Sequence, residues 1–489
     1  MTDLMQTETA AQDRVPVFQK IFYGFGSLAN NLVPASLGCM VIVLNLGLQM
    51  DPGKIGLILA FSKLTDAIID PIMGYISDHT GFRWGRRRPY IVVGAILSGL
   101  IYALMWQLPA GHSQHFYFWF FLIGTNLLFI VYTVFAAPFI GLGYEMTADY
   151  HERTRIQGYA NFIGQIAWLA VPWFWAIMSN KRFFPDSVAG ARGLALGVGA
   201  TITALGILPG LFCREPFYSI AVKEQEKDPQ KTKELIQGAL HHVAGFFKGF
   251  WITLKNRRFL QLAAATFLIF NGFQMIAGLG PYTIIYYLFR GDQSAGGKYI
   301  GLFGSLSSIF TFGVIFFITW IASKIGKKKA FILSTLIAIV GYAIKFPLYR
   351  PGSPNLILFS APLIAFGLGG LFTTIAAMIA DVCDQDELEN GHRREATFGA
   401  IYWWMVKLGM ALALAASGYL LNFTGFHEEL GGGQTARTLL LLRVYEIGVP
   451  IMAYLLAIVV MLPYDLTQEK ARVIRTELEK RRGTATATA

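Results

Sequence analysis

Three charged side chains interrupt a long apolar stretch of the chain near residues 53–77. Lys63, Asp66 and Asp70 are spaced i, i+3 and i+7, which places all three on one face of a helix. Two carboxylates one turn apart offer up to four oxygens to a hard cation such as sodium, and their repulsion favours a proton on one of them. A structural ion pair of Lys63 with one aspartate is the alternative. We expect Asp66 and Asp70 to form a cation-coupling site, with sodium as one candidate ion and Lys63 as the charge partner of the two carboxylates.

A fourth charge, Lys407, lies in the middle of the apolar stretch near 396–422. A lone lysine at membrane depth requires a negative partner, and Asp66 or Asp70 is the candidate. The pair is either one that a coupling ion displaces or a permanent structural pair. Trp403 lies one turn away on the same face, where an indole stacks on a sugar or packs in the core. We expect Lys407 and Trp403 to contact the substrate.

Amides and one further tryptophan inside other apolar stretches complete the predicted substrate site. Their alternative role is to tie neighbouring helices together, as polar side chains in membrane proteins often do. These candidates are Asn30, Asn31, Asn161, Gln165, Trp168 and Asn271.

A carboxylate next to a basic loop predicts a gate at one end of the second apolar stretch. Asp78 is followed by the basic run Arg86, Arg87 and Arg88, and Arg393 lies in a second basic segment. We expect this charge cluster to latch a gate that opens during transport. The alternative is that the basic residues only determine membrane topology.

The composition places these residues in a membrane and argues against a soluble enzyme. Of 489 residues, 54% are hydrophobic and 15% are charged, too few polar side chains to cover a water-soluble globule. One helical crossing takes about 20 apolar residues. The pattern therefore predicts an all-α membrane protein of twelve spans, near 19–49, 53–77, 89–107, 116–144, 157–179, 193–213, 259–289, 299–323, 330–348, 355–381, 396–422 and 439–463.

Charge placement predicts the orientation of these spans. Lys and Arg number 29 on the side that holds both termini and 8 on the other, so we expect cytoplasmic termini and a plasma, or inner, membrane location. The net charge of +11 lies in short segments between spans and indicates no nucleic-acid partner. The three cysteines have no paired spacing, so we expect no disulfide framework. The sequence contains no nucleotide-binding or hydrolase motif, so we expect neither a cofactor nor an enzymatic activity.

An internal repeat divides the chain into halves. Gly85–Ile91 aligns with Gly326–Ile332 at an offset of 241 residues, each between the second and third span of its half. We expect two pseudo-symmetric six-helix bundles that rock about a substrate site. The alternative is that basic clusters recur only because the positive-inside rule requires them. The expected parts are a cytoplasmic tail (1–18), a bundle (19–213), a connector with an interfacial amphipathic helix (214–258), a second bundle (259–463) and a cytoplasmic tail (464–489).

Several motifs together resemble one family, the glycoside–pentoside–hexuronide:cation symporters, which are the melibiose-carrier branch of the major facilitator superfamily. The resemblance covers almost the whole chain and implies the major facilitator fold. It also implies that Asp66 and Asp70 bind the cation and that Lys407 is the family's lysine on span eleven. The motifs are Tyr23–Gly26, Asp66–Gly74, Asp78, Gly85–Pro89, Pro138-Phe139, Glu145–Thr147, Glu152–Arg155, Ala380–Asp384, Gly391–Glu395 and Val406–Gly409.

The chain departs from the melibiose carriers at three charged positions that face sugar in those proteins. It has Asn31, Ala136 and Asn161 in place of two acids and an arginine. Because Ala136 replaces a carboxylate, a proton is favoured over sodium as the coupling ion.

The expected function is cation-coupled symport of a sugar, glycoside or uronide by a carrier that works as a monomer among membrane lipids. The alternatives are a carrier of a non-sugar substrate such as a lysolipid, and a membrane sensor that transports nothing.

Overall fold

The computed structural model describes residues 14–38, 42–107, 111–147, 149–215, 253–390 and 395–481. The chain divides into two compact units, Met1–Met50 with Phe61–Ala244, and Asp51–Ala60 with Gly245–Ala489. Arg393 and most of the connector predicted to form an amphipathic helix lie outside the described residues.

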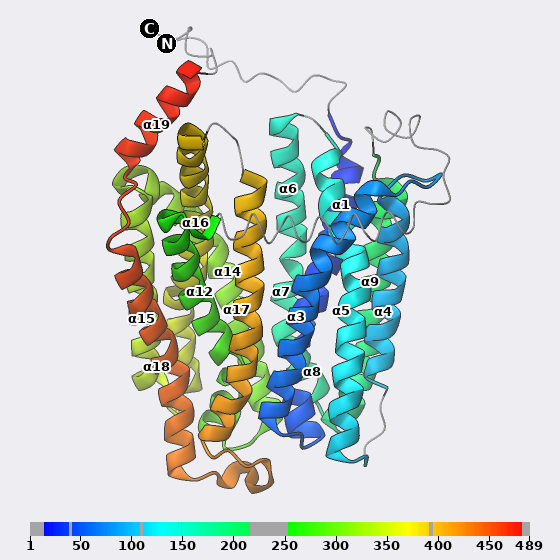
Figure 1. Cartoon of the computed structure of the whole chain (residues 1–489). Helices are drawn as coiled ribbons and strands as arrows, with labels where there is room; N and C mark the ends of the chain where they lie inside the picture. Colours follow the sequence, from blue (N-terminus) through cyan, green and yellow to red (C-terminus); the bar gives the residue numbers. More distant parts are fainter. Residues whose placement is uncertain are drawn as a thin grey trace. The chain divides into compact units, whose positions relative to one another are not determined.

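The first unit is built from helices that pack side by side (Figure 1). α4 packs on α5 and α9, and α1 packs on α6 and α9. The predicted fifth span is interrupted at Gln165 and again at η3, where Pro172 lacks the amide hydrogen that a continuous helix requires. The elements are α1 (Val17–Leu37), η2 (Val43–Gly47), α3 (Pro52–His79), α4 (Arg88–Met105), α5 (Gln114–Glu145), α6 (Tyr150–Gly164), α7 (Ile166–Ala170), η3 (Val171–Trp173), α8 (Phe174–Met178) and α9 (Ser187–Phe212).

The second unit also contains the first residues of α3, through Ala60. In it α16 packs on α14 and α15, and α12 packs on α17 and α18. Its elements are α12 (Arg257–Ala277), α13 (Gly280–Tyr282), η5 (Thr283–Leu288), α14 (Gln293–Ile325), α15 (Lys327–Leu348), η6 (Pro354–Ser360), α16 (Ala361–Asn390), α17 (Glu395–Phe423), η7 (Glu428–Gly433), α18 (Ala436–Met461) and α19 (Gln468–Arg481).

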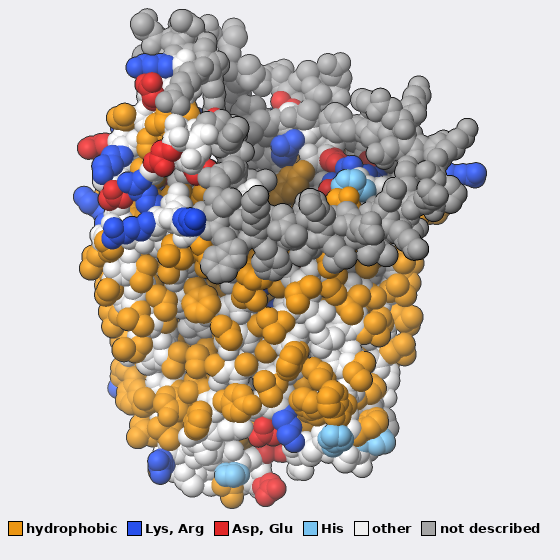
Figure 2. All heavy atoms as spheres, viewed as in Figure 1, with side chains coloured by type: hydrophobic (Ala, Val, Ile, Leu, Met, Phe, Trp, Pro, Cys, Tyr) orange, Lys and Arg blue, Asp and Glu red, His pale blue; other side chains and the backbone are white. Residues whose placement is uncertain are grey.

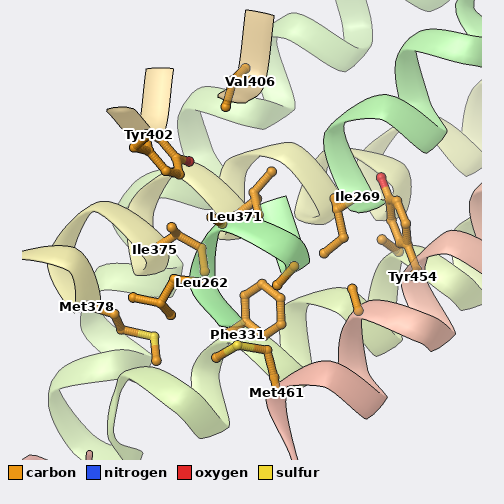
Figure 3. Packing of buried hydrophobic residues seen from close by; sticks show 14 of the residues in the cluster. Leu262, Ile269, Phe331, Leu371, Ile375, Met378, Tyr402, Val406, Tyr454 and Met461 are labelled. Carbon is orange, nitrogen blue, oxygen red and sulfur yellow. The ribbon is translucent and has the colours of Figure 1, made fainter. Parts of the chain in front are cut away.

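The core of the second unit lies where five helices meet. Figure 3 shows Leu262 and Ile269 of α12, Phe331 of α15 and Leu371 of α16 in this cluster, all fully buried, together with side chains of α17 and α18. Between membrane-spanning helices such side chains contribute van der Waals packing, because the lipid that surrounds the helices is as apolar as they are.

Ten helical segments among the described residues are long and apolar enough to cross a membrane. α1 and α3 are not among these ten; α3 carries the Lys63, Asp66 and Asp70 charges. Figure 2 shows hydrophobic side chains over the flanks of the helices and charged side chains gathered at their ends. All twelve predicted spans contain helix, which agrees with the expected all-α membrane fold.

The internal repeat extends to backbone geometry. The first span ends in the π-helix η2 and the seventh in the π-helix η5. Gln49 and Arg290 follow these turns and are the non-glycine residues with positive φ, 56° and 51°, in the described chain. They are 241 residues apart, the offset of the two basic loops, and Gly85 and Gly326 in those loops also have positive φ.

The hydrogen bonds that close these two turns are equivalent as well. The amide of Met50 donates to the carbonyl of Leu44, and the amide of Gly291 donates to that of Ile285, each at 2.9 Å. The Asp that follows each turn, Asp51 and Asp292, then accepts a hydrogen bond from the first turn of the next helix. The repeat therefore duplicates a complete turn and not merely a charge pattern.

A helix in the C-terminal tail was not predicted from the sequence. α19 packs on α16, and its Leu478 is buried. Its other face is polar and exposed, which is why the hydropathy of the segment gives no sign of a packed helix.

Candidate functional site

The charged face of α3 forms a buried polar centre in the first unit. Asp66 is 2% exposed, and its Oδ2 lies 3.7 Å from the Lys63 ammonium. The Thr133 hydroxyl of α5 lies 3.3 Å from Asp66 Oδ1. The Lys63 ammonium also lies 4.2 Å from the centre of the Phe129 ring, which attracts a cation through its π face. The structure therefore contains the ion pair between Lys63 and an aspartate that the spacing allowed.

Further hydroxyl and amide groups join α3 to α5 one and two turns away. Ser62 donates to the Thr125 hydroxyl at 2.8 Å, and Thr65 hydrogen-bonds to Asn126. Our reading of the sequence missed Thr125, Asn126 and Thr133. Thr125 and Thr133 are eight residues apart in an apolar span, so helical periodicity already places both on one face.

Asp70 and Lys407 are both half-buried, on α3 and on α17. They belong to different units of the structure. The predicted contact of Lys407 with an α3 carboxylate stays a prediction.

The two asparagines of the first span tie helices together. The Tyr132 hydroxyl donates to Asn30 Oδ1 at 3.0 Å, and Asn31 Nδ2 donates to the carbonyl of Gly164 at 3.1 Å. These bonds join α1 to α5 and α6. They correspond to the structural alternative for amides within membrane helices.

The predicted polar stripe on the fifth span begins at an exposed position of α6. Asn161 is exposed and Gln165 is half-buried where α6 ends and α7 begins. Trp168 is exposed, at 44% of its surface. The packing inside the first unit therefore leaves Asn161 and Trp168 largely uncovered.

Asn271 has an unusual environment in the second unit. It is 8% exposed, and neither its amide nitrogen nor its oxygen has a hydrogen-bond partner among the described residues. It packs on Gly409 of α17, where an added Cβ would lie 2.8 Å from Asn271 Cγ. An unpaired buried amide costs about 1–3 kcal/mol, which makes Asn271 a candidate for binding a polar ligand. It lies 241 residues after Asn30, whose side chain is paired.

Trp403 lies on α17 beside a second aromatic side chain. It is 53% exposed and stacks on Phe372, with ring centres 6.0 Å apart and planes at 16°. Its neighbour Tyr402 is buried and bonds to Thr266 of α12 at 3.2 Å. The exposed indole face is free of the core packing that holds Tyr402.

The predicted gate cluster forms at the ends of α3, α4 and α5. Arg87 lies 2.5 Å from Asp78 and 3.2 Å from Glu145, and Arg86 pairs with Glu145 and lies 3.8 Å from Asp78. Arg88 is different: it donates to the carbonyl of Leu211 at the end of α9. The Arg88 side chain thus completes the C-terminus of a neighbouring helix, and its part in a gate stays a prediction.

Glu215 also belongs to this cluster and was missed from the sequence. Its carboxylate accepts the backbone amides of Arg86 at 2.8 Å and of Arg87 and Arg88 at 3.0 Å. A carboxylate at this position accepts hydrogen bonds from backbone amides that would otherwise be unpaired at the start of α4. Its negative charge also interacts favourably with the positive end of the α4 dipole.

The sequence-based list of charges within spans was also incomplete. Lys345 of α15 and Glu446 of α18 form an ion pair inside the second unit, with side chains 5% and 0% exposed. Both lie within predicted spans, 330–348 and 439–463, so the criterion that found Lys407 applies to them equally.

Residues 22–468 match the family model described as MFS/sugar transport protein. The chain is 25% identical to the uncharacterized symporter YnaJ of Bacillus subtilis, with 96% of each chain covered. It is 23% identical to the sodium-dependent lysophosphatidylcholine symporter 1-B of Danio rerio, covering 96% of this chain and 91% of that protein.

Two further similarities concern sugars. The chain is 22% identical to the putative glycoside/cation symporter YagG of Escherichia coli, with 95% of each chain covered. The crystal structure of a D-xylose-proton symporter matches with a TM-score of 0.61 at 15% identity, over 92% of this chain and 98% of that one. The structural match concerns the fold.

Proposed function

The chain belongs to the MFS/sugar transport protein family, and from this premise we propose that it is a cation-coupled symporter of a sugar, glycoside or uronide. Its relatives are named as symporters, and one is named as a glycoside/cation symporter. The protein is an integral membrane carrier that works by alternating access between two bundles.

The observation that carries this proposal is the buried carboxylate of Asp66. It lies against Lys63 and Thr133 inside a helix bundle of a carrier family. Such a carboxylate is costly at membrane depth and marks an ion path by default. Lys63 balances its charge in the unloaded state.

Coupling follows from competition for this carboxylate. A cation or proton that binds Asp66 or Asp70 weakens the attraction of these carboxylates to Lys63. An ion with different affinities for the two arrangements of the carrier shifts the population between them. Substrate binding then favours the same arrangement, so that ion and substrate cross together.

The coupling ion is a proton in this proposal. Ala136 stands where the melibiose carriers have a carboxylate, which leaves Asp66 and Asp70 as the acids for a cation that prefers about six oxygens. Uptake measured at constant pH, with and without a sodium gradient, tests this assignment. Strong sodium stimulation that a proton ionophore leaves unchanged would reject the proton.

The substrate is bound by uncharged polar and aromatic side chains. Exposed Trp168 and Trp403 stack on sugar faces, and Asn161, Gln165 and Asn271 bond to hydroxyl groups. Asn271 is the strongest of these candidates because its amide has no partner among the described residues. A sugar hydroxyl both donates and accepts, as this amide requires.

A second candidate function is transport of a lysolipid. The observation that favours it is the 23% identity to the lysophosphatidylcholine symporter over nearly the whole chain. The acyl chain of a lipid substrate would pack on the exposed tryptophans. The loss of the charged sugar-facing residues at Asn31 and Asn161 is compatible with either substrate.

The orientation in this proposal has both termini in the cytoplasm and the carrier in the plasma, or inner, membrane. The excess of Lys and Arg in the segments on the side of the termini supports it. The carrier acts as a monomer, as one chain supplies both bundles.

Uptake into proteoliposomes tests the proposed function. Purified protein is reconstituted and given a panel of labelled glycosides, uronides and lysophosphatidylcholine under an imposed proton or sodium gradient. Accumulation of a sugar that collapses when the gradient is dissipated supports sugar symport. Accumulation of lysophosphatidylcholine alone supports the second candidate, and no accumulation of any compound by folded protein contradicts both.

A further inference from the structure

A buried charge cluster in the second unit contacts the broken end of the seventh span. The Glu446 carboxylate of α18 pairs with Lys345 of α15, and the Tyr349 hydroxyl lies 2.7 Å from Glu446 Oε2 and 2.9 Å from Oε1. Lys345 is 4% and Glu446 0% exposed. Each oxygen of this carboxylate has a donor, so the cluster is complete within the second unit.

The cluster lies against the segment where the seventh span departs from an α-helix. A Cβ at Gly280, the first residue of α13, would lie 3.3 Å from Glu446 Oε1. Tyr287 of η5 meets the Tyr349 ring edge-on, with centres 6.1 Å apart, and lies 4.3 Å from the guanidinium of Arg443 on α18. Charged groups of α15 and α18 thus contact both ends of this segment.

The first half of the chain provides an internal control for the role of these charges. η2 forms the same π-helical turn as η5, with equivalent hydrogen bonds, and packs on α9 as η5 packs on α18. There the contact is made by Val188 and Ser187, which lie next to Gly47. α9 has no acidic residue, and α4 has no charged residue after Arg88. The turn itself therefore forms without buried charges.

A buried ion pair is also a costly way to hold two helices together. Replacement of such a pair by apolar residues of similar volume is often neutral or stabilising. Packing of α15 on α18 does not by itself require Lys345 and Glu446. Their position beside Gly280 and Tyr287 relates them to the seventh span instead.

We propose that Lys345 and Glu446 are positioning residues that hold the segment 278–291 of the seventh span in its π-helical arrangement against α15 and α18. In the described residues 42–50 of the first span, the corresponding backbone carbonyls of Leu48 and Met50 accept hydrogen bonds from the uncharged amides of Gln114 and Asn45. The two equivalent turns therefore differ in what holds them: charged groups contact the segment of the seventh span, whereas uncharged amides and apolar side chains contact that of the first.

Hydrogen–deuterium exchange of the reconstituted protein tests this inference without any measurement of transport. The double variant K345L/E446L removes both charges together, so that no unpaired charge remains buried. We expect the amides of 279–291 to exchange about tenfold faster than in the parent protein, while those of 43–50 are unchanged. Failure of the proposed transport function would leave this result unaffected.

Three comparisons make the result specific. The charge-reversed variant K345E/E446K is expected to return exchange of 279–291 to the parent rate. K327A, which breaks a 2.7 Å ion pair with Asp381 on α16, is the matched control and leaves 279–291 unchanged. Y349F, which keeps both charges and removes one donor, gives an intermediate acceleration and replaces the double variant if that protein fails to fold.

Two outcomes overturn the inference. One is parent-like exchange of 279–291 in both K345L/E446L and Y349F. The other is equal acceleration of 43–50 and 279–291, which indicates general loosening of the protein. An unchanged melting temperature in K345L/E446L, combined with local acceleration, separates positioning from a purely structural contribution.

Discussion

Lys63 and Asp66 form an ion pair within one turn of α3, with the ammonium 3.7 Å from Asp66 Oδ2 and above the ring of Phe129. The distance is longer than that of a charge-assisted hydrogen bond, which is about 2.7–2.9 Å. We therefore expect an entering ion to compete with Lys63 for this carboxylate. The Phe129 ring gives the Lys63 ammonium a second favourable contact beside the carboxylate.

Replacement of Asp66 by Asn is expected to abolish gradient-driven accumulation while substrate exchange without a gradient remains. Asn keeps the size of the side chain but has no charge for an ion to bind. The loss of coupling should be at least about tenfold, within the range of typical coupling free energies. Uptake and counterflow in the same proteoliposomes measure the two activities.

The control for this variant is Asp186→Asn, at the N-cap of α9. Asn and Asp cap helices about equally well, so this substitution keeps the cap. Parent-like accumulation by Asp66→Asn would remove Asp66 from the coupling site.

Lys407→Ala is expected to uncouple transport before it prevents folding, because the lone charge of the eleventh span requires compensation. The measurement is accumulation per molecule of folded protein, compared with Lys329→Ala, which changes an exposed lysine of α15. Normal accumulation by Lys407→Ala would assign the lysine a structural role. Loss of expression would instead indicate that an unpaired aspartate remains buried, which destabilises the fold by about 3–5 kcal/mol.

Gly409→Ala is expected to displace Asn271. The new Cβ would lie 2.8 Å from Asn271 Cγ and 2.9 Å from its Oδ1, an overlap that costs about 1–3 kcal/mol of folding free energy. Thermal unfolding measures the loss, and the substrate KM reports displacement of the amide.

Two companion variants check this explanation. Gly399→Ala, on the same helix with no atom within 4 Å of the new Cβ, should not be destabilised. Asn271→Ala combined with Gly409→Ala should recover stability but not affinity. If the double variant stays as unstable as Gly409→Ala, the contact with Asn271 is not the cause.

Glu428 is expected to make stability depend on pH near neutrality. Burial, and then the neighbouring charge of Glu429, raise the pKa of Glu428 from 4.5 to about 7. The folded state therefore favours the protonated acid. The contribution of Glu428 to the free energy of unfolding is full below pH 4.5 and is lost as the pH rises through about 7. Melting temperatures at pH 5 and pH 8 measure this change.

Glu428→Gln should remove that part of the pH dependence, because the amide does not ionise. Glu429→Gln is the matched control and should lower the pKa of Glu428 without removing its titration. Equal pH dependence in the parent and in Glu428→Gln would assign the effect to another group.

The sequence alone determined the features that depend on local spacing. Apolar runs of sufficient length predicted the helical spans, because a bilayer requires about 20 apolar residues in each crossing. The i, i+3 spacing of Lys63 and Asp66 allowed their pairing, because one turn of a helix brings such side chains together whatever surrounds it. The offset of 241 residues between the basic loops also predicted a duplication that the backbone extends to Gln49 and Arg290.

Only the tertiary structure decided which distant side chains meet. Glu446 and Lys345 are 101 residues apart, and Asn271 meets Gly409 across two helices. Arg88 is an arginine next to Arg86 and Arg87, yet its side chain donates a hydrogen bond to the end of α9. Helical periodicity specifies the face on which a side chain lies but not the helix that covers that face, because that choice depends on how complementary surfaces pack. The partners of buried polar groups were therefore decided by packing.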